Sequence, residues 1–280
     1  MRVDAAVAWG ASRLAEAGIE APRRTALWLL EHSAEISPTA AIAYPERLLD
    51  DGESAWFVAA VERRASGVPL QHIVGEQEFH GLAFEVTPAV LIPRAETEIL
   101  VDAAIARWRE RARNGEWIVD VGTGSGCIPV VLARECAGAR VAAVDVSAPA
   151  LEVARRNAIR HSADVHFITG DLLSAVSGPF EVVTANLPYI PDGDIPELQR
   201  EVRDHDPRLA LAGGPDGLDV YRRLLSDVSR VLAPDGVLFC EIGIGQTEAY
   251  SRIVAEHGLR LVEGLDDVAG IPRVMVVELR

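Results

Sequence analysis

Cysteines, long apolar runs and positive charges are all scarce in this sequence of 280 residues. No stretch approaches the ~18 consecutive apolar residues that a membrane-spanning helix requires, so we expect no membrane span. Residues 1–20 mix charged and apolar residues at helical spacing and lack the apolar core of a signal peptide. The three cysteines (Cys127, Cys136 and Cys240) are odd in number and lack metal-ligand spacing. We therefore expect a reduced, cytoplasmic protein without a disulfide framework or a bound metal.

Acidic residues outnumber basic ones, and the formal net charge is −15. This charge repels a phosphate backbone, because non-specific affinity for nucleic acid comes from Lys and Arg contacts. A local basic patch is compatible with this net charge, but the excess of acidic residues disfavours direct nucleic-acid binding. Since 49% of the residues are hydrophobic, a sizeable core can be buried. The length suits one large domain, or a medium domain with a small one.

The first part of the chain, residues 1–75, has the pattern of an all-helical domain. Apolar residues recur at three- and four-residue spacing, as with Leu27 and Leu30. Pro22 and Pro38 stand where helices are expected to start, because proline is tolerated in the first helical turn. We expect a separate helical domain over these residues.

Residues 76–90 change character and indicate a β-hairpin linker. The stretch 78–86 (EFHGLAFEV) is typical of two short strands around a glycine turn. The remaining residues, 91–280, then form a second domain.

Strands and helices alternate through this second domain. Strands are expected at 117–121, 140–145, 165–168, 180–185, 237–242, 259–263 and 273–279. Helices are expected at 95–112, 126–136, 148–161, 217–232 and 246–257, with a long loop before 217. This alternation predicts an α/β fold with a mostly parallel, doubly wound sheet.

A glycine-rich run follows the first strand of this domain: Gly122-Thr123-Gly124-Ser125-Gly126. Glycines allow a sharp turn and a close approach of a ligand to the backbone, and the next helix presents free N–H groups to an anion. Taken alone, the run could equally serve tight packing or a dinucleotide. Its Gly-x-Gly-x-Gly spacing, however, differs from the Gly-x-Gly-x-x-Gly dinucleotide fingerprint.

Three acidic residues end consecutive predicted strands: Asp120, Asp145 and Asp171. Asp145 is placed to accept hydrogen bonds from ribose hydroxyls. Asp171 could accept from an adenine amino group, with Leu172 against the ring. Any one of them could be a solvated turn or helix cap, but all three together predict a nucleoside site at the switch point of the sheet.

The strand at 180–185 runs into a tetrapeptide, Asn186-Leu187-Pro188-Tyr189. It resembles the Asn-Pro-Pro-Tyr motif of methyltransferases that act on planar amino groups, although Asn and Pro also favour a plain strand-ending turn. Four further stretches resemble one branch of these enzymes: 75–79 (GEQEF), 91–98 (LIPRAETE), 201–211 (EVRDHDPRLAL) and 213–218 (GGPDGL). That branch is the protein-(glutamine-N5) methyltransferase family, which modifies the glutamine of the Gly-Gly-Gln loop in peptide chain release factors.

The resemblance covers nearly the whole chain and implies a fold, a cofactor and a partner. The fold is a Rossmann-like class I methyltransferase sheet of seven strands, one of them antiparallel, behind a small all-helical N-terminal domain. The cofactor is S-adenosylmethionine, which leaves as S-adenosylhomocysteine. The partner is a protein, with a release factor favoured and a ribosomal protein as the alternative, and residues 1–75 are expected to recognise it. Implied cofactor contacts are Gly122, Thr123, Gly124, Ser125, Gly126, Asp145, Asp171, Leu172 and Asn186.

The tetrapeptide is also the expected catalytic motif. A carboxamide nitrogen is a poor nucleophile, so much of the task is to align it with the methyl group. The side-chain oxygen of Asn186 can accept one amide N–H and the backbone carbonyl of Leu187 the other, while Tyr189 packs on the amide plane. Leu187 replaces the proline that is usual in the family, so its fixed φ is lost, although Pro188 still restricts Leu187. We expect the function to survive with somewhat less rigidity.

Other functions remain open at this stage. The Asn-Leu-Pro-Tyr string also resembles adenine-dimethylating enzymes that act on ribosomal RNA, so an adenine-N6 methyltransferase on DNA or RNA is the alternative. A non-catalytic protein on the same scaffold is a third. Arg94 and Glu98 belong to the family-like linker motif without an assigned role, and Glu241 is interpreted as a strand end.

Overall fold

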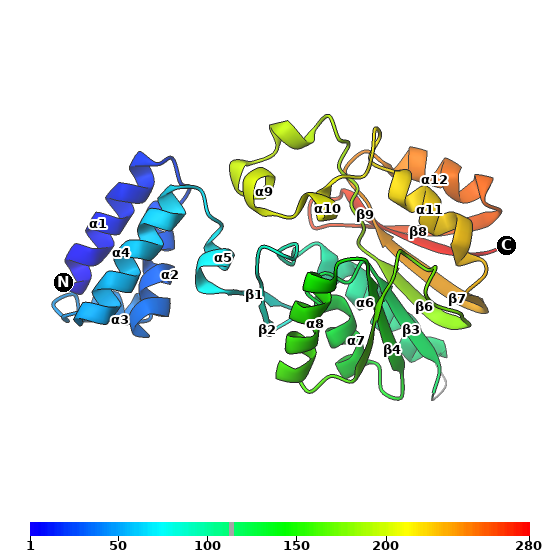
Figure 1. Ribbon diagram of the computed structural model, residues 1–280, viewed down its shortest axis with the longest axis horizontal. Coiled ribbons are helices and arrows are strands. Elements are labelled where there is room, and N and C mark those ends of the chain that lie inside the picture. The colour runs from blue at the N-terminus through cyan, green and yellow to red at the C-terminus, as the bar shows by residue number, and fades with distance from the viewer. Residues whose placement is uncertain (112–114) are drawn as a thin grey trace. The chain divides into compact units, whose positions relative to one another are not determined.

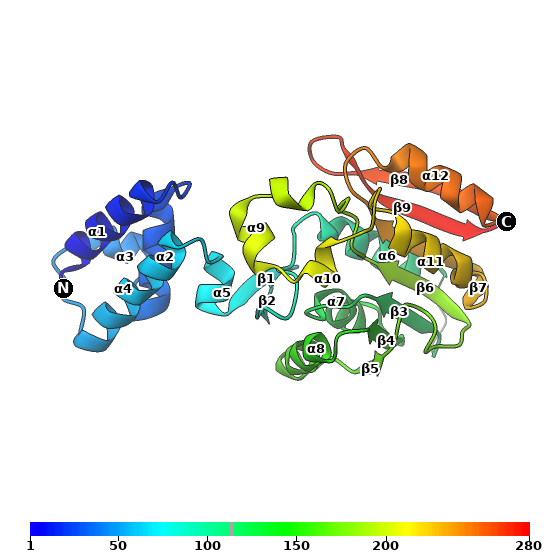
Figure 2. The ribbon, with the colours of Figure 1, turned by 45° about the horizontal axis from the view of Figure 1, so that its top comes forward.

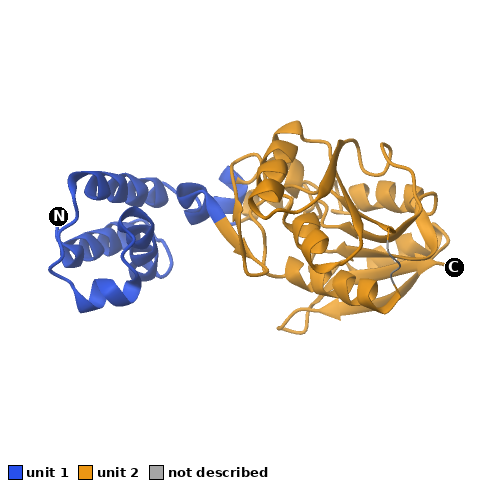
Figure 3. Cartoon of the chain, turned by 90° about the horizontal axis from the view of Figure 1, so that it is seen from below, with its two compact units in different colours: residues 1–76, 199–205 blue, residues 77–198, 206–280 orange. Residues whose placement is uncertain are grey.

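The computed structural model describes residues 1–111 and 115–280 of the chain (Figure 1). It divides into two compact units, coloured separately in Figure 3. The first unit is Met1–Glu76 with Gln199–His205, and the second is Gln77–Leu198 with Asp206–Arg280. A short segment therefore belongs to the first unit although the chain on both of its sides belongs to the second.

The first unit is all helical up to Gly75, as predicted. Its elements are α1 (Val3–Glu16), α2 (Pro22–Ala34), α3 (Pro38–Ala43), α4 (Asp51–Ala65), α5 (Leu70–Val74) and α9 (Arg200–His205). Both predicted helix starts are confirmed, since Pro22 and Pro38 open α2 and α3. A capping box begins α4, where the Asp50 and Glu53 side chains each accept a hydrogen bond from the other's backbone N–H.

The two short strands of the predicted hairpin are present. They are β1 (Glu76–Phe79) and β2 (Leu82–Glu85), which pair in a two-stranded sheet. Gly81 has a φ of +72°, in the left-handed region that glycine adopts at little cost. The turn therefore occurs where the sequence predicts it.

The second unit is built on a seven-stranded sheet. Its strands are β3 (Trp117–Val121), β4 (Arg140–Asp145), β5 (Val165–Thr169), β6 (Phe180–Ala185), β7 (Leu232–Glu241), β8 (Leu259–Asp266) and β9 (Pro272–Leu279). Their order is β5-β4-β3-β6-β7-β9-β8. β9 runs antiparallel to both of its neighbours, and the other pairs are parallel. The predicted α/β sheet with one antiparallel strand is confirmed.

Helices cover both faces of this sheet. They are α6 (Thr97–Arg111), α7 (Cys127–Glu135), α8 (Ala148–Arg160), α11 (Asp219–Val228) and α12 (Thr247–Glu256). Figure 2 shows α8 beside β4 and β5, and α12 beside β8 and β9. Ile118 of β3 is buried in the cluster with α6 and α7, whereas Val119 and Val121 are buried in the cluster with α11 and α12. Burial on both faces explains why the strand has no alternating pattern.

The largest differences from the predicted boundaries occur at the end of α11 and the start of β7. The helix predicted at 217–232 ends at Val228, and the strand predicted from 237 begins at Leu232. The sequence Pro234-Asp235-Gly236 has the composition of a turn, but pairing with β6 extends the strand through it. The register shifts there, because Phe180 pairs with Leu232 and Val182 with Val237.

The long loop predicted before residue 217 also contains regular structure, namely η1 (Ile195–Glu197), α9 and α10 (Arg208–Leu211). These elements are too short to show a helical period in the sequence. The helix predicted over 95–112 is α6, and its predicted last residue lies outside the described residues. Across residues 1–111 and 115–280, the structure has no helix that is both long enough and apolar enough to span a bilayer.

Candidate active site

The strand order places the two predicted motifs side by side. The chain goes from β3 outward to β4 and β5, and then returns to β6 on the other side of β3. Val121 pairs with Ala185, so the residues that follow them, Gly122 and Asn186, leave the same edge of the sheet on adjacent strands. Such a switch point is where open α/β sheets bind ligands.

A cavity opens at this edge of the sheet. Most of the predicted site residues line it: Gly122, Thr123, Gly124, Ser125, Asp145, Asp171, Leu172, Asn186, Leu187 and Pro188. Gly126 and Tyr189 are not among the described residues that line it. The cavity thus joins the glycine-rich loop, the acidic strand ends and the Asn186 motif.

The three glycines of the loop have different surroundings. A Cβ at Gly122 would come within 2.6 Å of Leu187 Cδ2, and a Cβ at Gly126 would come within 2.8 Å of Ala154 Cβ. At Gly124 nothing lies within 4 Å of a Cβ position. All three have positive φ values. Gly122 and Gly126 therefore permit close packing, and Gly124 leaves the backbone open toward the cavity.

Asp145 fixes the shape of this loop. Its Oδ2 accepts a hydrogen bond of 2.8 Å from the backbone N–H of Gly124, and its Oδ1 accepts one of 2.8 Å from that of Ser147. Each carboxylate oxygen keeps a second lone pair, so the same side chain can also accept from ribose hydroxyls. These residues fit a nucleoside that carries an amino-acid group, with the carboxylate of that group near the start of α7.

Asp171 and Leu172 lie at the cavity, but Asp171 has a partner that the sequence analysis missed. Arg223 of α11 forms an ion pair with it, and both side chains are more than half exposed. Leu172 has a φ of +50°, which is unusual for a residue with a side chain. Arg223 is 52 residues away in sequence, and no local pattern marks it.

The side-chain amide of Asn186 has a defined orientation. Its Nδ2 donates hydrogen bonds of 3.0 Å to Glu241 Oε2 and 3.0 Å to Thr97 Oγ1. The two acceptor oxygens are themselves 2.6 Å apart, so they hold the NH₂ group from one side, and Oδ1 accepts no hydrogen bond from the described part of the chain. Since Asn186 lines the cavity, the oxygen is the group that it can offer to a ligand.

Glu241, interpreted from the sequence as a strand end, is fully buried at the end of β7. Besides the Asn186 amide, it accepts hydrogen bonds from Thr97 Oγ1 at 2.6 Å and from the Tyr189 hydroxyl at 3.2 Å. Burial raises the pKa of the Glu241 carboxyl, while the Thr97 hydrogen bond and the charge of Arg273 act in the opposite direction. Its position is indeed a strand end, but its side chain connects α6 with the segment that follows β6. In the sequence, the signal for this buried role was an acidic residue directly after the four apolar residues of a buried strand.

The backbone at Leu187 is held by a second residue that the sequence analysis missed. Leu187, unlike a proline, has an N–H group, which donates a hydrogen bond of 3.2 Å to the hydroxyl oxygen of Tyr221. Tyr221 is fully buried on α11, and its hydroxyl donates to the backbone carbonyl of Glu241. The backbone N–H that leucine has at position 187, and that proline would lack, therefore has a hydrogen-bond partner inside the protein.

Asp120 is fully buried beneath the glycine-rich loop. Its Oδ1 accepts a hydrogen bond of 2.8 Å from Thr184 Oγ1 on the neighbouring strand. Burial raises the pKa of this carboxyl to about 6, with a smaller contribution from the charge of Asp145. Asp120 does not line the cavity among the described residues, in keeping with a supporting place behind the loop.

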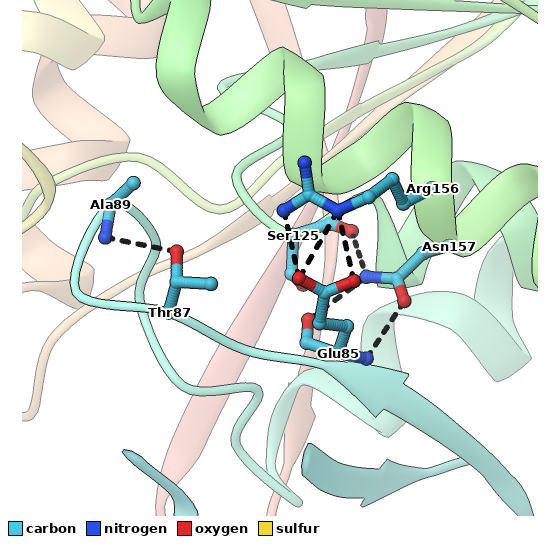
Figure 4. Close-up of polar contacts among 6 residues, drawn as sticks. All are labelled: Glu85, Thr87, Ala89, Ser125, Arg156 and Asn157. Atoms are coloured by element: carbon cyan, nitrogen blue, oxygen red, sulfur yellow. Dashed lines mark hydrogen bonds and ion pairs between the residues drawn. The ribbon is translucent and has the colours of Figure 1, made fainter. Parts of the chain in front are cut away.

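Asn157 of α8 joins the hairpin to the glycine-rich loop (Figure 4). Its Oδ1 accepts from the backbone N–H of Glu85 at 2.7 Å, and its Nδ2 donates to the carbonyls of Glu85 at 3.0 Å and Ser125 at 2.9 Å. Arg156, next to it, forms an ion pair with the Glu85 side chain. Asn157 is completely buried, so these hydrogen bonds are shielded from water.

Of the two linker-motif residues, Arg94 lines the cavity and Glu98 does not. Arg94 forms an ion pair of 2.7 Å with Asp206, whose side chain is 1% exposed. Burial raises the pKa of Asp206 to about 6, and the charge of Arg94 opposes the rise. Glu98 instead accepts a hydrogen bond from the backbone N–H of His80 in the hairpin turn.

Comparisons with known proteins show the family and the fold class of the chain. Residues 97–201 match the family described as "Methyltransferase small domain", and residues 5–75 match "PrmC N-terminal domain". The solved structure of the 16S rRNA N2 G1207 methyltransferase of T. thermophilus is similar, with a TM-score of 0.53 and 18% identity. The match covers 73% of this chain and 50% of that one. Fold and site together define a class I methyltransferase that depends on S-adenosylmethionine.

Curated relatives narrow this class. The release factor glutamine methyltransferase of Geobacter sulfurreducens is 40% identical over 95% of this chain and 93% of its own length. That of Moorella thermoacetica is 42% identical over 96% of this chain and 95% of its own length. The chain belongs to the family of release factor glutamine methyltransferases.

Proposed function

We propose that this protein transfers the methyl group of S-adenosylmethionine to the side-chain amide nitrogen of a glutamine in a peptide chain release factor. The target is the glutamine of the Gly-Gly-Gln loop, and S-adenosylhomocysteine is the second product. The observation that carries the proposal is the Asn186 side chain, which offers an oxygen to the cavity while its NH₂ group is held by Glu241 and Thr97 within the protein. Family membership favours this reaction over adenine-N6 methylation.

The proposed clamp has two acceptors for one planar NH₂ group. The Asn186 side-chain oxygen takes one amide N–H and the Leu187 carbonyl takes the other, so that the nitrogen is aligned and its developing positive charge is stabilised. Pro188 restricts the backbone of Leu187. Tyr189 would pack its ring on the amide plane, and its hydroxyl donates a hydrogen bond to Glu241. When bound, S-adenosylmethionine supplies an electrophilic methyl group. The glutamine nitrogen gains this methyl group and then loses one proton to solvent.

The cofactor contacts are proposed from the loop geometry. Gly122, Thr123, Gly124, Ser125 and Gly126 would hold the amino-acid end, aided by the free N–H groups at the start of α7. Asp145 would accept from the ribose, and Asp171 with Leu172 would contact the adenine. Asn186 would lie beside the methyl group. We propose no metal in this reaction.

We propose that three segments of the chain have different roles. Residues 1–75 recognise the protein substrate, 76–90 form the hairpin linker, and 91–280 carry the methyltransferase reaction. The acidic charge of the whole chain fits a protein substrate better than a nucleic acid. A cytoplasmic location follows from a partner that acts in translation.

Mass spectrometry of a purified release factor, after incubation with the enzyme and labelled S-adenosylmethionine, tests the proposal. We expect one added methyl group on the Gly-Gly-Gln glutamine. Asn186→Ala should lower the rate of methyl transfer by a factor of about 100 or more, because one of the two acceptors for the amide N–H groups is lost. Calorimetry should still detect S-adenosylmethionine binding to this variant. Methylation elsewhere, or normal turnover by Asn186→Ala, would contradict the proposal.

A further inference from the structure

We infer that Glu241 is a positioning residue that sets the hydrogen-bond polarity of the acceptor site, so that the site selects a carboxamide over a carboxylate. This inference rests on the proposed function and adds a residue that acts through Asn186 rather than on the substrate. A carboxamide side chain such as Asn186 can present either its oxygen or its NH₂ to a ligand. Something in the protein must choose between the two.

The contacts of Glu241 make that choice. An ionised carboxylate only accepts hydrogen bonds, and Glu241 Oε2 lies 3.0 Å from Asn186 Nδ2. If the amide were turned round, its oxygen would face the carboxylate oxygen at the same distance, with no proton between them. Thr97 reinforces the choice, since its hydroxyl donates to Glu241 and can therefore only accept from Asn186.

Three donors favour the ionised form of Glu241. The hydroxyls of Thr97 and Tyr189 and the amide of Asn186 all donate to its two oxygens. Burial raises the pKa of Glu241, and the positive charge of Arg273, on the neighbouring strand β9, acts with these donors in the opposite direction. A fully buried carboxylate with this many donors is held in one place, because each lost hydrogen bond would leave a buried polar group unpaired.

The consequence is chemical selection at the cavity. With its oxygen outward, Asn186 attracts a group that carries N–H, such as the glutamine amide. It repels the oxygen of a glutamate side chain of the same size. Discrimination of this kind is strong, because a mismatched ligand leaves buried polar groups unpaired.

The first test compares two replacements of Glu241. Glu241→Gln keeps one acceptor oxygen for Asn186 and can turn its NH₂ toward the Tyr189 hydroxyl, so kcat should stay within about tenfold of the wild type. Glu241→Met has a similar volume and no oxygen. We expect its kcat for a release factor to fall by about 100-fold, since a misplaced clamp costs alignment. The KM for release factor and the Kd for S-adenosylmethionine should change less than about threefold. Glu96→Gln is the control, because Glu96 is a nearby exposed acid.

The second test exchanges the partners. Asn186→Asp alone sets two carboxylates against each other and should lose about 100-fold in kcat. Adding Glu241→Gln supplies an NH₂ group that donates to the introduced carboxylate, whose other oxygen again faces the cavity. We expect the double variant to be at least about tenfold more active than Asn186→Asp. Glu241→Gln would thus bring no gain in the wild-type background and at least about a tenfold gain in the Asn186→Asp background, which a general packing role for Glu241 does not produce.

Two readouts separate this inference from the proposed function. By NMR, the side-chain NH₂ protons of Asn186 should exchange slowly with water in the wild type and faster in Glu241→Met, whatever the enzyme methylates. A release factor with Glu in place of the target Gln should compete weakly with the wild type and gain affinity for Glu241→Met. Unchanged exchange, wild-type kcat in Glu241→Met or an additive double variant would overturn the inference. A wild-type enzyme that leaves the glutamine unmethylated would instead overturn the proposed function.

Discussion

At Leu187 one residue departs from the pattern usual in the family, and its surroundings accommodate the change. Proline would fix φ and have no N–H, whereas leucine brings a donor that must be satisfied when buried. Tyr221 accepts this hydrogen bond, and the Leu187 side chain fills the space that a Cβ at Gly122 would need. The expectation of lower rigidity remains a prediction, but the structure supplies a physical substitute for the lost restraint.

Asp120 provides a prediction about stability and pH. Its folded pKa of about 6 lies above the ordinary value of 3.8, so the folded protein binds the proton more tightly than the unfolded chain. The contribution of this carboxyl to the free energy of unfolding therefore falls as pH rises from about 4 to about 6, by about 3 kcal/mol in total, and stays low above that range. Asp120→Asn retains an acceptor for Thr184 and cannot ionise. We expect it to be more stable than the wild type at pH 7, measured by urea denaturation.

The stability that Asp120→Asn gains over the wild type should depend on pH in a defined direction. It should shrink as pH falls through about 6 and vanish below about 4, where the wild-type carboxyl is protonated in both states. Asp164→Asn, at an exposed position, changes the net charge equally and should show no such trend. A gain at pH 7 that persists unchanged at pH 4 would show that the charge of Asp120 is not its cause.

Among the elements, the central strands and α8 position the cofactor loop. The loop follows β3 and packs against α8 through Gly126, while Asn157 of α8 binds both the loop and the hairpin. The loop is thus held from the side of the helix as well as by the strand. Such shielded hydrogen bonds are costly to remove, because each leaves a buried backbone group without a partner.

Asn157→Ala should therefore affect both stability and cofactor binding. Two carbonyls and one N–H group lose a partner, and we expect a loss of about 2–4 kcal/mol in the free energy of unfolding. The affinity for S-adenosylmethionine should fall as the loop loosens, as measured by calorimetry. Arg156→Ala is the matched control, since its ion pair with Glu85 is largely exposed and should contribute less than about 1 kcal/mol. Equal effects of the two substitutions would disprove the role of the buried amide.

At the scale of the whole molecule, the segment 199–205 links, along the chain, the proposed substrate-recognition domain and the proposed methyltransferase domain. It follows the Asn186 motif in the chain and precedes cavity-lining residues such as Pro207, yet it packs within the helical unit. Arg64 of α4, which is buried, forms an ion pair with Glu201 of α9. The proposed substrate-recognition domain is therefore tied to the chain that borders the active site.

Glu201→Ala tests this connection. It leaves the Arg64 guanidinium buried without its carboxylate partner, at a cost of about 1–3 kcal/mol, which should loosen α9. We expect the KM for release factor to rise by about three- to tenfold, with the Kd for S-adenosylmethionine unchanged by calorimetry. Asp204→Asn removes exposed ion pairs of the same helix and should have little effect. An unchanged KM in Glu201→Ala would mean that α9 does not transmit substrate binding.

Much of the fold and part of the site were determined by the sequence itself. Helix starts at Pro22 and Pro38, the hairpin turn at Gly81 and the alternation of strands and helices depend on local backbone preferences, which a sequence displays directly. The same holds for the glycine-rich loop and the Asn186 motif, since each is a continuous segment whose residue types already limit its chemistry.

Tertiary structure alone decided which groups face one another. Glu241 lies 55 residues from Asn186 and Arg223 lies 52 from Asp171, and strand order together with helix packing brings them into contact. The extension of β7 to Leu232 and the placement of α9 also depend on partners far along the chain. Local residue preferences carry no information about such contacts, because their free energy comes from burial and pairing that exist only once the chain has folded.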